Sequence, residues 1–326
     1  MKTVFIVNPK SGSGKKLNTI VDELEKLRRQ IAEDVEVYFT KFSSDAKEYV
    51  SNYCREKGPA RFIACGGDGT FNEVLNGVID FEDAQIGVVP IGTGNDFCRN
   101  FLNGVNFFDL EKQVSAKSVK CDAIKYITNV NGEEKTGYCA NMFNVGFDCA
   151  VADMTNTLKE KTILSGTFSY LFSIFANLIN KKSSHIDIDI DDKCRHRGEL
   201  LLTSIANGSF CGGGLKTNPL ACVTDGFINI NIVKNISRLR FLTLLPKYIN
   251  GTYLKMPNIE KIVSSEKCRK VKINSLKGNI RISIDGEISD AGVTEFEIVP
   301  KAFNFVVPCY DAFEIDNEKI EKAILV

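Results

Sequence analysis

The first 120 residues alternate short apolar runs with segments whose apolar residues recur at helical spacing. The apolar runs predict β-strands at Thr3–Val7, Val35–Phe39, Arg61–Cys65 and Gln85–Ile91. Helical spacing between them predicts helices over Lys15–Gln30, Asp45–Lys57 and Thr70–Val78, the second capped by Asp45. Because strands and helices alternate, we expect a parallel sheet covered by helices, with ligands at the carboxyl ends of the strands.

From about Lys120 the pattern changes to strand-like runs joined by turn residues. The runs are Ala123–Val130, Thr136–Val145, Ser184–Asp191, Glu199–Asn207, Gly226–Val233, Val271–Asn274, Asn279–Ile284 and Glu295–Val299. Asn131-Gly132, between the first two runs, is a hairpin signal. Aspartates at 187, 189 and 191 alternate with isoleucines, which indicates one solvated face rather than metal ligands. We therefore expect an α/β domain at residues 1–120 and an antiparallel β domain at 121–302.

Composition narrows the class of protein. The chain has 326 residues, 44% of them hydrophobic, which is enough for two domain cores. Basic and acidic residues number 41 each, so no overall basic field favours nucleic acid. The 11 cysteines form no C-x-x-C pair, and there are only 2 histidines, which favours reduced thiols and gives a zinc site little support. The first apolar run is too short for a signal peptide, and we expect a cytoplasmic protein.

A glycine-rich turn, Cys65–Glu73, directly follows the third predicted strand. Three of its residues are glycines placed around Asp68. Glycines let backbone N–H groups approach a ligand closely, and the helix that follows would point its positive end at the same place. The turn therefore predicts a phosphate site, and a tight strand-to-helix turn is the alternative.

Two further loops follow predicted strands. Asn8–Lys15 looks like a Walker loop, but Pro9 replaces a required glycine and Lys16 a required Ser or Thr. Its donors fit either a looser nucleotide contact or a capping turn. Gly92–Phe97 has Phe97 where a dinucleotide-binding loop needs its third glycine, which argues against NAD bound in the Rossmann manner. Thr40 also follows a strand, and spacing alone favours an ordinary strand-end threonine.

Two Asp-Gly pairs mark turns in the second half, at Asp225 and at Asp285. Glu287 comes just after the second pair and follows an alternating strand, so we expect its carboxylate at a strand end. The glycine run Gly208–Gly214 allows either a tight fold or room for a bulky substrate, and the sequence does not separate the two.

The ordered set of motifs, over nearly the whole chain, resembles the diacylglycerol kinase catalytic family. That family includes bacterial diacylglycerol kinases, related lipid kinases, and sphingosine and ceramide kinases. The motifs are Asn8-Pro9-x-Ser11-Gly12, Gly66-Gly67-Asp68-Gly69-Thr70-x-Asn72-Glu73, Pro90-x-Gly92-Thr93-x-Asn95-Asp96-Phe97, Asn144-x-Gly146-Phe147-Asp148, Gly212-Gly213-Gly214, Asp225-Gly226 and Asp285-Gly286-Glu287.

The resemblance implies a set of site residues. Asp68 and Asp96 would lie at the phosphate and Mg²⁺ end of the site, and Glu287 would be the general base. Asp225 would hold a structural Mg²⁺ with carbonyls near Cys222 and Phe227. The fold would be a phosphofructokinase-like α/β domain plus a β-sandwich, with residues 303–326 returning to the first domain. The implied ATP-binding residues are Asn8, Pro9, Lys10, Ser11, Gly12, Thr40, Gly66, Gly67, Asp68, Gly69, Thr70, Asn72 and Thr93.

The implied activity is transfer of the γ-phosphoryl group of ATP to a lipid hydroxyl, with diacylglycerol giving phosphatidic acid. A sphingosine, ceramide or phosphatidylglycerol acceptor is an alternative. NAD kinase is another, because it shares the glycine-aspartate loop. A non-catalytic lipid-binding protein would be expected to have lost an acid, and Asp68, Asp96 and Glu287 are all present.

Two amphipathic segments, Phe168–Ile179 and Ile236–Lys255, bear on membrane contact. Each is too short or too polar to span a bilayer. They fit either core-facing helices or an interfacial surface that holds the protein at the inner face of a membrane. The sequence does not decide between a monomer and a homodimer.

Overall fold

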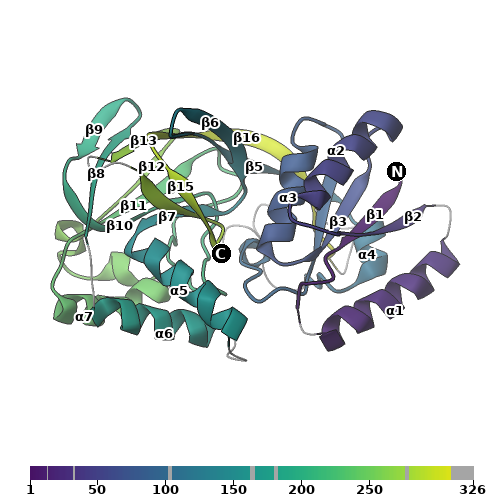
Figure 1. Ribbon diagram of the computed structural model, residues 1–326, viewed down its shortest axis with the longest axis horizontal. Helices are drawn as coiled ribbons and strands as arrows, with labels where there is room; N and C mark the ends of the chain where they lie inside the picture. Colours follow the sequence, from purple (N-terminus) through teal and green to yellow (C-terminus); the bar gives the residue numbers. More distant parts are fainter. Residues whose placement is uncertain are drawn as a thin grey trace. The chain divides into compact units, whose positions relative to one another are not determined.

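The computed structural model describes residues 1–309 except for residue 13 and the segments 32–33, 102–104, 162–165, 180–182 and 276–278. Residues 310–326, part of the segment predicted to return to the first domain, lie outside this range. The chain divides into two units (Figure 1). Unit 1 comprises Met1–Asp122 with the residues from Lys301 onward, and unit 2 comprises Ala123–Pro300.

Unit 1 contains a parallel sheet in the order β4-β3-β1-β2. The strands are β1 (Thr3–Val7), β2 (Val35–Phe39), β3 (Arg61–Gly66) and β4 (Gln85–Pro90). The last residues of β16 (Thr294–Val306) run parallel beside β4, with Asn304 opposite Gln85. Every residue of β1 and β3 is buried, as a parallel sheet covered on both faces requires. The α/β fold predicted for the first half of the chain is confirmed.

Helices cover both faces of this sheet (Figure 1). α1 (Gly14–Gln30) and the short α4 (Leu110–Ser115) pack together on one face. α2 (Asp45–Lys57) and α3 (Asp68–Val78) pack together on the other. A 3₁₀ turn, η1 (Phe97–Asn100), follows the loop after β4.

Aromatic side chains tie the end of β16 into unit 1. The ring centroid of Phe305 lies 4.7 Å from that of Phe101, 5.0 Å from that of Phe97 and 5.8 Å from that of Phe71. All four rings are buried. Such ring pairs contribute beyond the area that they bury, so β16 is an integral part of this core.

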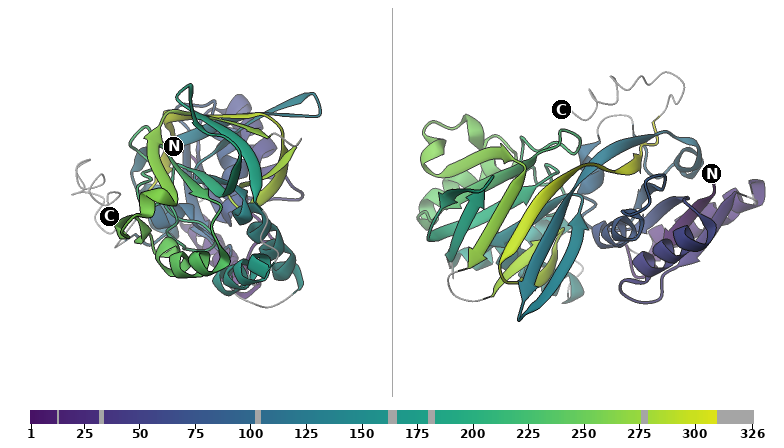
Figure 2. Two further views of the ribbon diagram at one scale, coloured as in Figure 1. Left: turned by 90° about the vertical axis from the view of Figure 1, so that its left-hand side faces the viewer. Right: turned by 90° about the horizontal axis from the view of Figure 1, so that it is seen from above.

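Unit 2 is an antiparallel β-sandwich with helices on one side, seen from above in Figure 2. One sheet has the order β15-β14-β7-β10-β11-β12, and the other has the order β9-β8-β13-β16-β5-β6. The predicted β-sandwich is confirmed. The strands not yet bounded are β5 (Ser118–Val130), β6 (Glu133–Cys139), β7 (Met142–Gly146), β8 (Ser184–Ile190), β9 (Lys193–His196), β10 (Glu199–Ala206), β11 (Ile228–Lys234), β12 (Val263–Cys268), β13 (Lys270–Ser275), β14 (Ile280–Ile284) and β15 (Glu287–Ala291).

Two cores stabilise unit 2. One lies between the sheets and takes side chains from both, among them Phe143 and Ile205 from one and Val271 and Phe296 from the other. The second core lies under the helices α5 (Phe147–Lys161), α6 (Gly166–Ile179) and α7 (Arg238–Ile249), with the 3₁₀ turns η2 (Tyr253–Lys255) and η3 (Ile259–Lys261) beside them. Among the described residues, no helix is long and apolar enough to cross a membrane.

The predicted strand Thr136–Val145 is two strands, β6 and β7, and the single-strand prediction is wrong. The break falls at Ala140 and Asn141, where the chain passes from one sheet to the other. Asn207 Nδ2 donates to the carbonyl of Ala140 at 2.7 Å, and Asn141 Nδ2 donates to the carbonyl of Phe210 at 2.7 Å. Contacts made far along the chain therefore hold the break.

One local prediction in unit 2 is confirmed, and a second is confirmed in part. Asn131 and Gly132 form the turn between β5 and β6, with φ angles of 55° and 90°. In β8 the isoleucines are buried, while Asp187 and Asp189 point outward and pair with Arg197 at 3.5 and 2.8 Å. Asp191, the third predicted acid of this face, lies beyond the end of β8, and its Oδ1 accepts the N–H groups of Arg269 and Lys270, both at 3.0 Å.

Candidate active site

Four loops leave the carboxyl ends of β1, β2, β3 and β4 along one edge of unit 1. The loop after β1 is fixed to α3, because Asn8 Nδ2 donates to Thr70 Oγ1 at 3.0 Å. It also folds on itself: the N–H of Lys10 donates to Asn8 Oδ1 and the N–H of Ser11 to the carbonyl of Asn8, both at 3.0 Å. The loop therefore has a defined shape against the first turn of α3.

The loops after β3 and β4 pack backbone against backbone. The N–H of Gly92 donates to the carbonyl of Gly66 at 3.1 Å. A Cβ atom added to Gly92 would lie 2.3 Å from the Cα atom of Gly67, and one added to Gly66 would lie 2.3 Å from Thr70 Oγ1. No side chain fits at either position, so close packing accounts for these glycines whatever the loops bind.

Asp68, the first residue of α3, joins the same two loops through its carboxylate. Oδ2 accepts a hydrogen bond from the N–H of Asn95 at 2.7 Å, and Oδ1 accepts one from the N–H of Asp96 at 2.8 Å. Burial raises the pKa of the Asp68 carboxyl, and the bonds from the backbone N–H groups oppose that rise. Asp68 thus holds the loop after β4 in place.

Asp68 and Asp96 each have a carboxylate oxygen near Gly94. A Cβ atom added to Gly94 would lie 2.6 Å from Asp68 Oδ2 and 3.3 Å from Asp96 Oδ2, so both carboxylates face that glycine. Each ionised carboxylate oxygen has two lone pairs, and oxygen ligands suit Mg²⁺. Within the described ranges no three acidic, histidine or cysteine side chains form a metal-binding group. Mg²⁺ at this pair would take its other ligands from phosphates and water, and it would share Asp96 with Arg99, whose Nε lies 3.7 Å from Asp96 Oδ1.

The loop after β2, which begins at Thr40, is held by two carboxylates. Glu73 of α3 accepts hydrogen bonds from the N–H groups of Ser44 at 2.9 Å and Ala46 at 3.2 Å, at the start of α2. Asp45 accepts one from the N–H of Lys41 at 2.7 Å. The prediction that Asp45 caps α2 is wrong: Ser44 is the cap residue, and Glu73 bonds the first N–H groups of the helix.

The predicted ATP-binding residues lie in these loops, in the first turns of α3 or, for Gly66, at the last position of β3. The N–H of Thr40 donates to the carbonyl of Val7 at 2.9 Å, which sets that threonine beside the end of β1. Thr93, Pro9 and Lys10 are exposed, and Asn72 is half-buried. Their roles toward ATP, with those of the remaining predicted residues, stay predictions.

Glu287 lies in unit 2 as the first residue of β15. Asp285 and Gly286, with φ angles of 48° and 92°, form the turn that precedes it, and Ile284 is its partner on β14. The turn is fixed to β7, because Asp285 N–H donates to the carbonyl of Met142 at 3.1 Å and Asp285 Oδ1 accepts the N–H of Met142 at 2.9 Å. The exposed carboxylate of Glu287 thus stands on a well-held hairpin, and its role as a base stays a prediction.

Tyr126 is a neighbour of Glu287 that sequence reasoning missed. Burial raises the pKa of Tyr126, and its neighbours Cys139 and Glu287 add to that rise. Its ring packs edge-on against Phe143 at 5.3 Å and covers Gly137, where an added Cβ atom would lie 2.8 Å from the ring. A glycine directly opposite a tyrosine in the β5–β6 hairpin was the available signal.

Asp225, the predicted ligand of a structural Mg²⁺, has partners within unit 2. Oδ1 accepts the N–H of Phe227 at 3.0 Å, and Oδ2 lies 2.5 Å from Lys267 Nζ. The Cys222 thiol lies 3.5 Å from Thr224 Oγ1. A cation at Asp225 would have to compete with the Lys267 ammonium group, so these residues fit a second Mg²⁺ poorly, and the site stays a prediction.

The glycine run in unit 2 makes a tight loop. Cys211 and Leu215 exchange two backbone hydrogen bonds, at 2.9 and 2.8 Å. Gly212, Gly213 and Gly214 between them have φ angles of 61°, 84° and 110°. These are left-handed values that favour glycine, and the turn accounts for the run.

Two family models match the chain. A diacylglycerol kinase catalytic domain matches residues 2–126. A YegS C-terminal NAD kinase beta sandwich-like domain matches residues 141–307, about half of the chain.

Individual relatives cover most of the chain. A diacylglycerol kinase of Bacillus subtilis (strain 168) is 26% identical over 319 residues, 96% of this chain and 98% of that protein. A protein of Cronobacter sakazakii named "Probable lipid kinase YegS-like" is 31% identical over 232 residues, 70% of this chain and 73% of that protein. A crystal structure of a diacylglycerol kinase from Bacillus anthracis strain Sterne has the same fold, with a TM-score of 0.68 and 20% identity over 94% of this chain and 96% of that chain.

Proposed function

The chain belongs to the diacylglycerol kinase family of lipid kinases, which transfer a phosphoryl group to an alcohol, and we propose that it phosphorylates diacylglycerol with ATP. The attacking lipid hydroxyl forms a bond to the γ-phosphorus of ATP, and the bond from that phosphorus to the bridging oxygen breaks. The products are phosphatidic acid, ADP and one proton. The observation that carries the proposal is the Asp68–Asp96 pair, held at the strand ends of a diacylglycerol kinase catalytic domain.

The residues of unit 1 hold the phosphates of ATP. The positive end of α3 supplies anion donors at the edge where the strands end. Asp68 and Asp96 hold Mg²⁺, which supplies neutralisation of the phosphate charge when bound. Asp68 also positions the loop after β4, so one residue serves both tasks.

Glu287 of unit 2 accepts the proton of the attacking hydroxyl. Its hairpin is held by Asp285, which fixes the backbone that carries Glu287. A positioned base of this kind raises the rate about 10²- to 10⁴-fold.

The test compares Glu287→Gln with the wild type in mixed micelles that contain radiolabelled ATP and diacylglycerol. We expect turnover to fall by about 10²- to 10⁴-fold, with ATP affinity by calorimetry unchanged. Glu133→Gln is the matched control, because Glu133 is also exposed and also begins a strand after a two-residue turn. A Glu287→Gln enzyme with the wild-type rate would remove Glu287 from this role.

The same assay ranks the acceptors. Phosphatidylglycerol, sphingosine, ceramide and NAD replace diacylglycerol one at a time. The proposal requires that diacylglycerol give the highest kcat/KM. A second candidate is another lipid hydroxyl, supported by relatives of Staphylococcus aureus that are named lipid kinases without a stated acceptor.

A further inference from the structure

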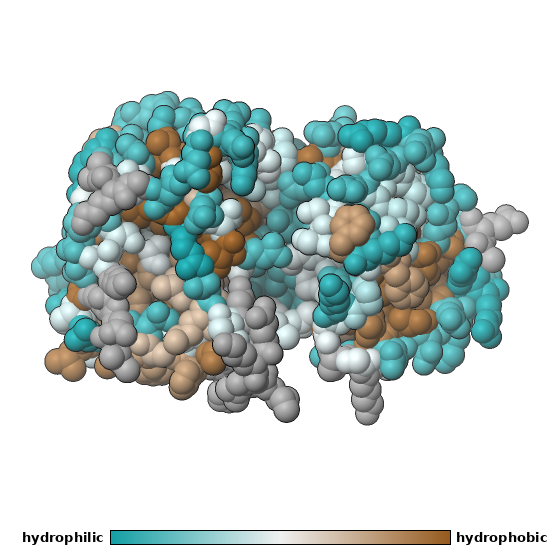
Figure 3. Space-filling view, in the orientation of Figure 1, coloured by the Kyte–Doolittle hydropathy of each residue, from teal (hydrophilic) through white to brown (hydrophobic). Residues whose placement is uncertain are grey.

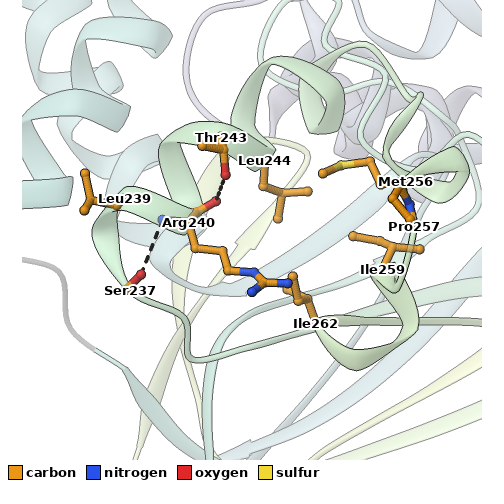
Figure 4. Close-up of a pocket in the computed structure, with 9 residues that line it drawn as sticks. All are labelled: Ser237, Leu239, Arg240, Thr243, Leu244, Met256, Pro257, Ile259 and Ile262. Atoms are coloured by element: carbon orange, nitrogen blue, oxygen red, sulfur yellow. Dashed lines mark hydrogen bonds between the residues drawn. The ribbon is translucent and has the colours of Figure 1, made fainter.

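A groove in unit 2 lies between the start of α7 and the segment around η3 (Figure 4). Its volume is about 420 Å³, within the range of pockets that bind small ligands. Leu244, Ile259 and Ile262 form its apolar floor and are themselves buried. Met256 faces them from the segment before η3. The groove is therefore an apolar trough open to solvent.

Among the residues that line this groove, Arg240 is the one with a charged side chain. Its side chain extends from α7 toward Ile262 (Figure 4). Its backbone N–H bonds to Ser237 Oγ at 3.3 Å, and its carbonyl accepts the Thr243 hydroxyl at 2.9 Å. Over the part of the chain that the structure describes, no carboxylate lies within ion-pair distance of its guanidinium. A guanidinium group with this freedom can pair with an anion through two parallel hydrogen bonds.

The surroundings of the groove are basic although the whole chain has no net charge. Between residues 234 and 259 the sequence has no acidic residue and five basic ones, Lys234, Arg238, Arg240, Lys247 and Lys255. Two leucines on the same helix face solvent: Leu239 is 78% exposed and Leu242 is 38% exposed. Basic side chains beside exposed apolar ones are typical of a helix that rests on an anionic membrane.

The neighbouring helix adds to this apolar surface. Phe172 and Phe175 of α6 are both exposed by more than half. Hydrophobic side chains gather on the face of unit 2 that α6 and α7 form (Figure 3). Both helices also bury side chains in the second core of unit 2. The prediction of core-facing helices describes this buried side, and the alternative of an interfacial surface concerns the exposed side.

We propose that the groove binds one anionic phospholipid, with its phosphate at Arg240 and an acyl chain along the apolar floor. The inference rests on the proposed function in expecting a membrane lipid as the partner, and it goes beyond that function. Diacylglycerol carries no charge and offers Arg240 no anionic group for a charge-assisted pair, so this lipid is an anchor and not the acceptor. It would retain the kinase on the anionic membrane in which a neutral acceptor dissolves.

The first test uses dihexanoyl phosphatidylglycerol, dispersed as monomers, in calorimetric titrations. Arg240→Gln should weaken binding about tenfold or more, as the loss of a charge-assisted pair implies. Lys247→Gln is the matched control: it removes the same charge from the same helix, and Lys247 does not line the groove. Its affinity for the monomeric lipid should equal that of the wild type. Equal loss in both variants would overturn the proposal in favour of a diffuse charge effect.

Two further ligands test whether the groove recognises both the charge and the acyl chains of an anionic phospholipid. Dihexanoyl phosphatidylcholine has the same chains with no net charge, and we expect it to bind at least tenfold more weakly. Inorganic phosphate has the anion without the chains. If it bound as tightly as the lipid, the apolar floor would have no role and the proposal would fail.

Vesicles then connect the groove to the membrane. The wild type should sediment with vesicles that contain phosphatidylglycerol, and Arg240→Gln should bind them about fivefold more weakly. Its kinase rate with a short-chain diacylglycerol in neutral micelles should be unchanged. Glu287→Gln should keep full vesicle binding. A wild-type protein that binds the lipid and has no kinase activity would refute only the proposed function. A wild-type protein with kinase activity and no lipid binding would refute only this inference.

Discussion

Asp68→Asn tests the role of Asp68 as the link between two loops. The carboxylate accepts one N–H from Asn95 and one from Asp96, at 2.7 and 2.8 Å. An asparagine has nearly the same shape, but one of its two end groups is an NH₂ donor. Whichever way the amide turns, one backbone N–H meets a donor and loses its bond.

The expected cost follows from these two bonds. A hydrogen bond to a charged group stabilises a protein by about 1.5–3 kcal/mol, and an unpaired N–H costs about 1–3 kcal/mol more. Removing the charge also removes the cost of burying it, which the raised pKa of Asp68 reflects. We therefore expect the free energy of unfolding to fall by about 2 kcal/mol, a large share of the roughly 5–15 kcal/mol of a typical domain.

The measurement is urea unfolding of the protein without ATP or Mg²⁺, followed by far-UV circular dichroism and tyrosine fluorescence, since the chain has no tryptophan. The control is Asp83→Asn, which removes an exposed charge of the same unit and should change stability by less than about 0.5 kcal/mol. If Asp68→Asn weakens ATP or Mg²⁺ binding with no change in the urea midpoint, Asp68 is a ligand only and the linking role is refuted.

Three other changes test the geometry. Gly92→Ala places a methyl group 2.3 Å from the Cα atom of Gly67, so we expect about 1–3 kcal/mol of lost stability and weaker ATP binding by calorimetry; unchanged affinity would contradict the close packing. Glu73→Gln removes a charge from the start of α2 and should lower the unfolding free energy by about 1 kcal/mol, measured in urea. Hydrogen bonds from Arg281 hold the pKa of Asp153 below its ordinary value. Their contribution to the free energy of unfolding is therefore full above about pH 4, and it is lost as the pH falls through the lowered pKa. Because both groups are half exposed, Arg281→Gln should lower stability by at most about 1 kcal/mol at pH 6 and by nothing near pH 2; an equal loss at both would refute the pairing.

The strands of unit 1 could be predicted because burial on both faces leaves a direct mark on sequence. β1 and β3 are apolar or small almost throughout, and their predicted bounds agree with the structure to within a residue. The division between β6 and β7 left no such mark. It depends on Asn141 meeting Phe210, 69 residues further on.

The candidate site could be predicted as a set of residues but not as a set of contacts. Sequence reasoning selected Asp68 and the loop Gly92–Asp96 separately, and only the adjacency of β3 and β4 shows that one carboxylate binds the other loop's backbone. Glu73 was recognised only as part of a motif, and its role in capping α2 depends on how two helices pack. Lys267, the partner of Asp225, is 42 residues away, so the local sequence around Asp225 does not predict this pair either.

The course of β16 affects the order in which the two units can fold during synthesis. The strand that lies beside β4, and the Phe305 ring within the aromatic core of unit 1, come from the far end of the described chain. A ribosome that has finished the first 122 residues has made the other helices and strands of that unit but not this one. Until some 180 further residues emerge, one edge of β4 and the ring of Phe97 lack their partner and need protection from aggregation. Unit 1 can thus be completed only after the residues of unit 2 have been made.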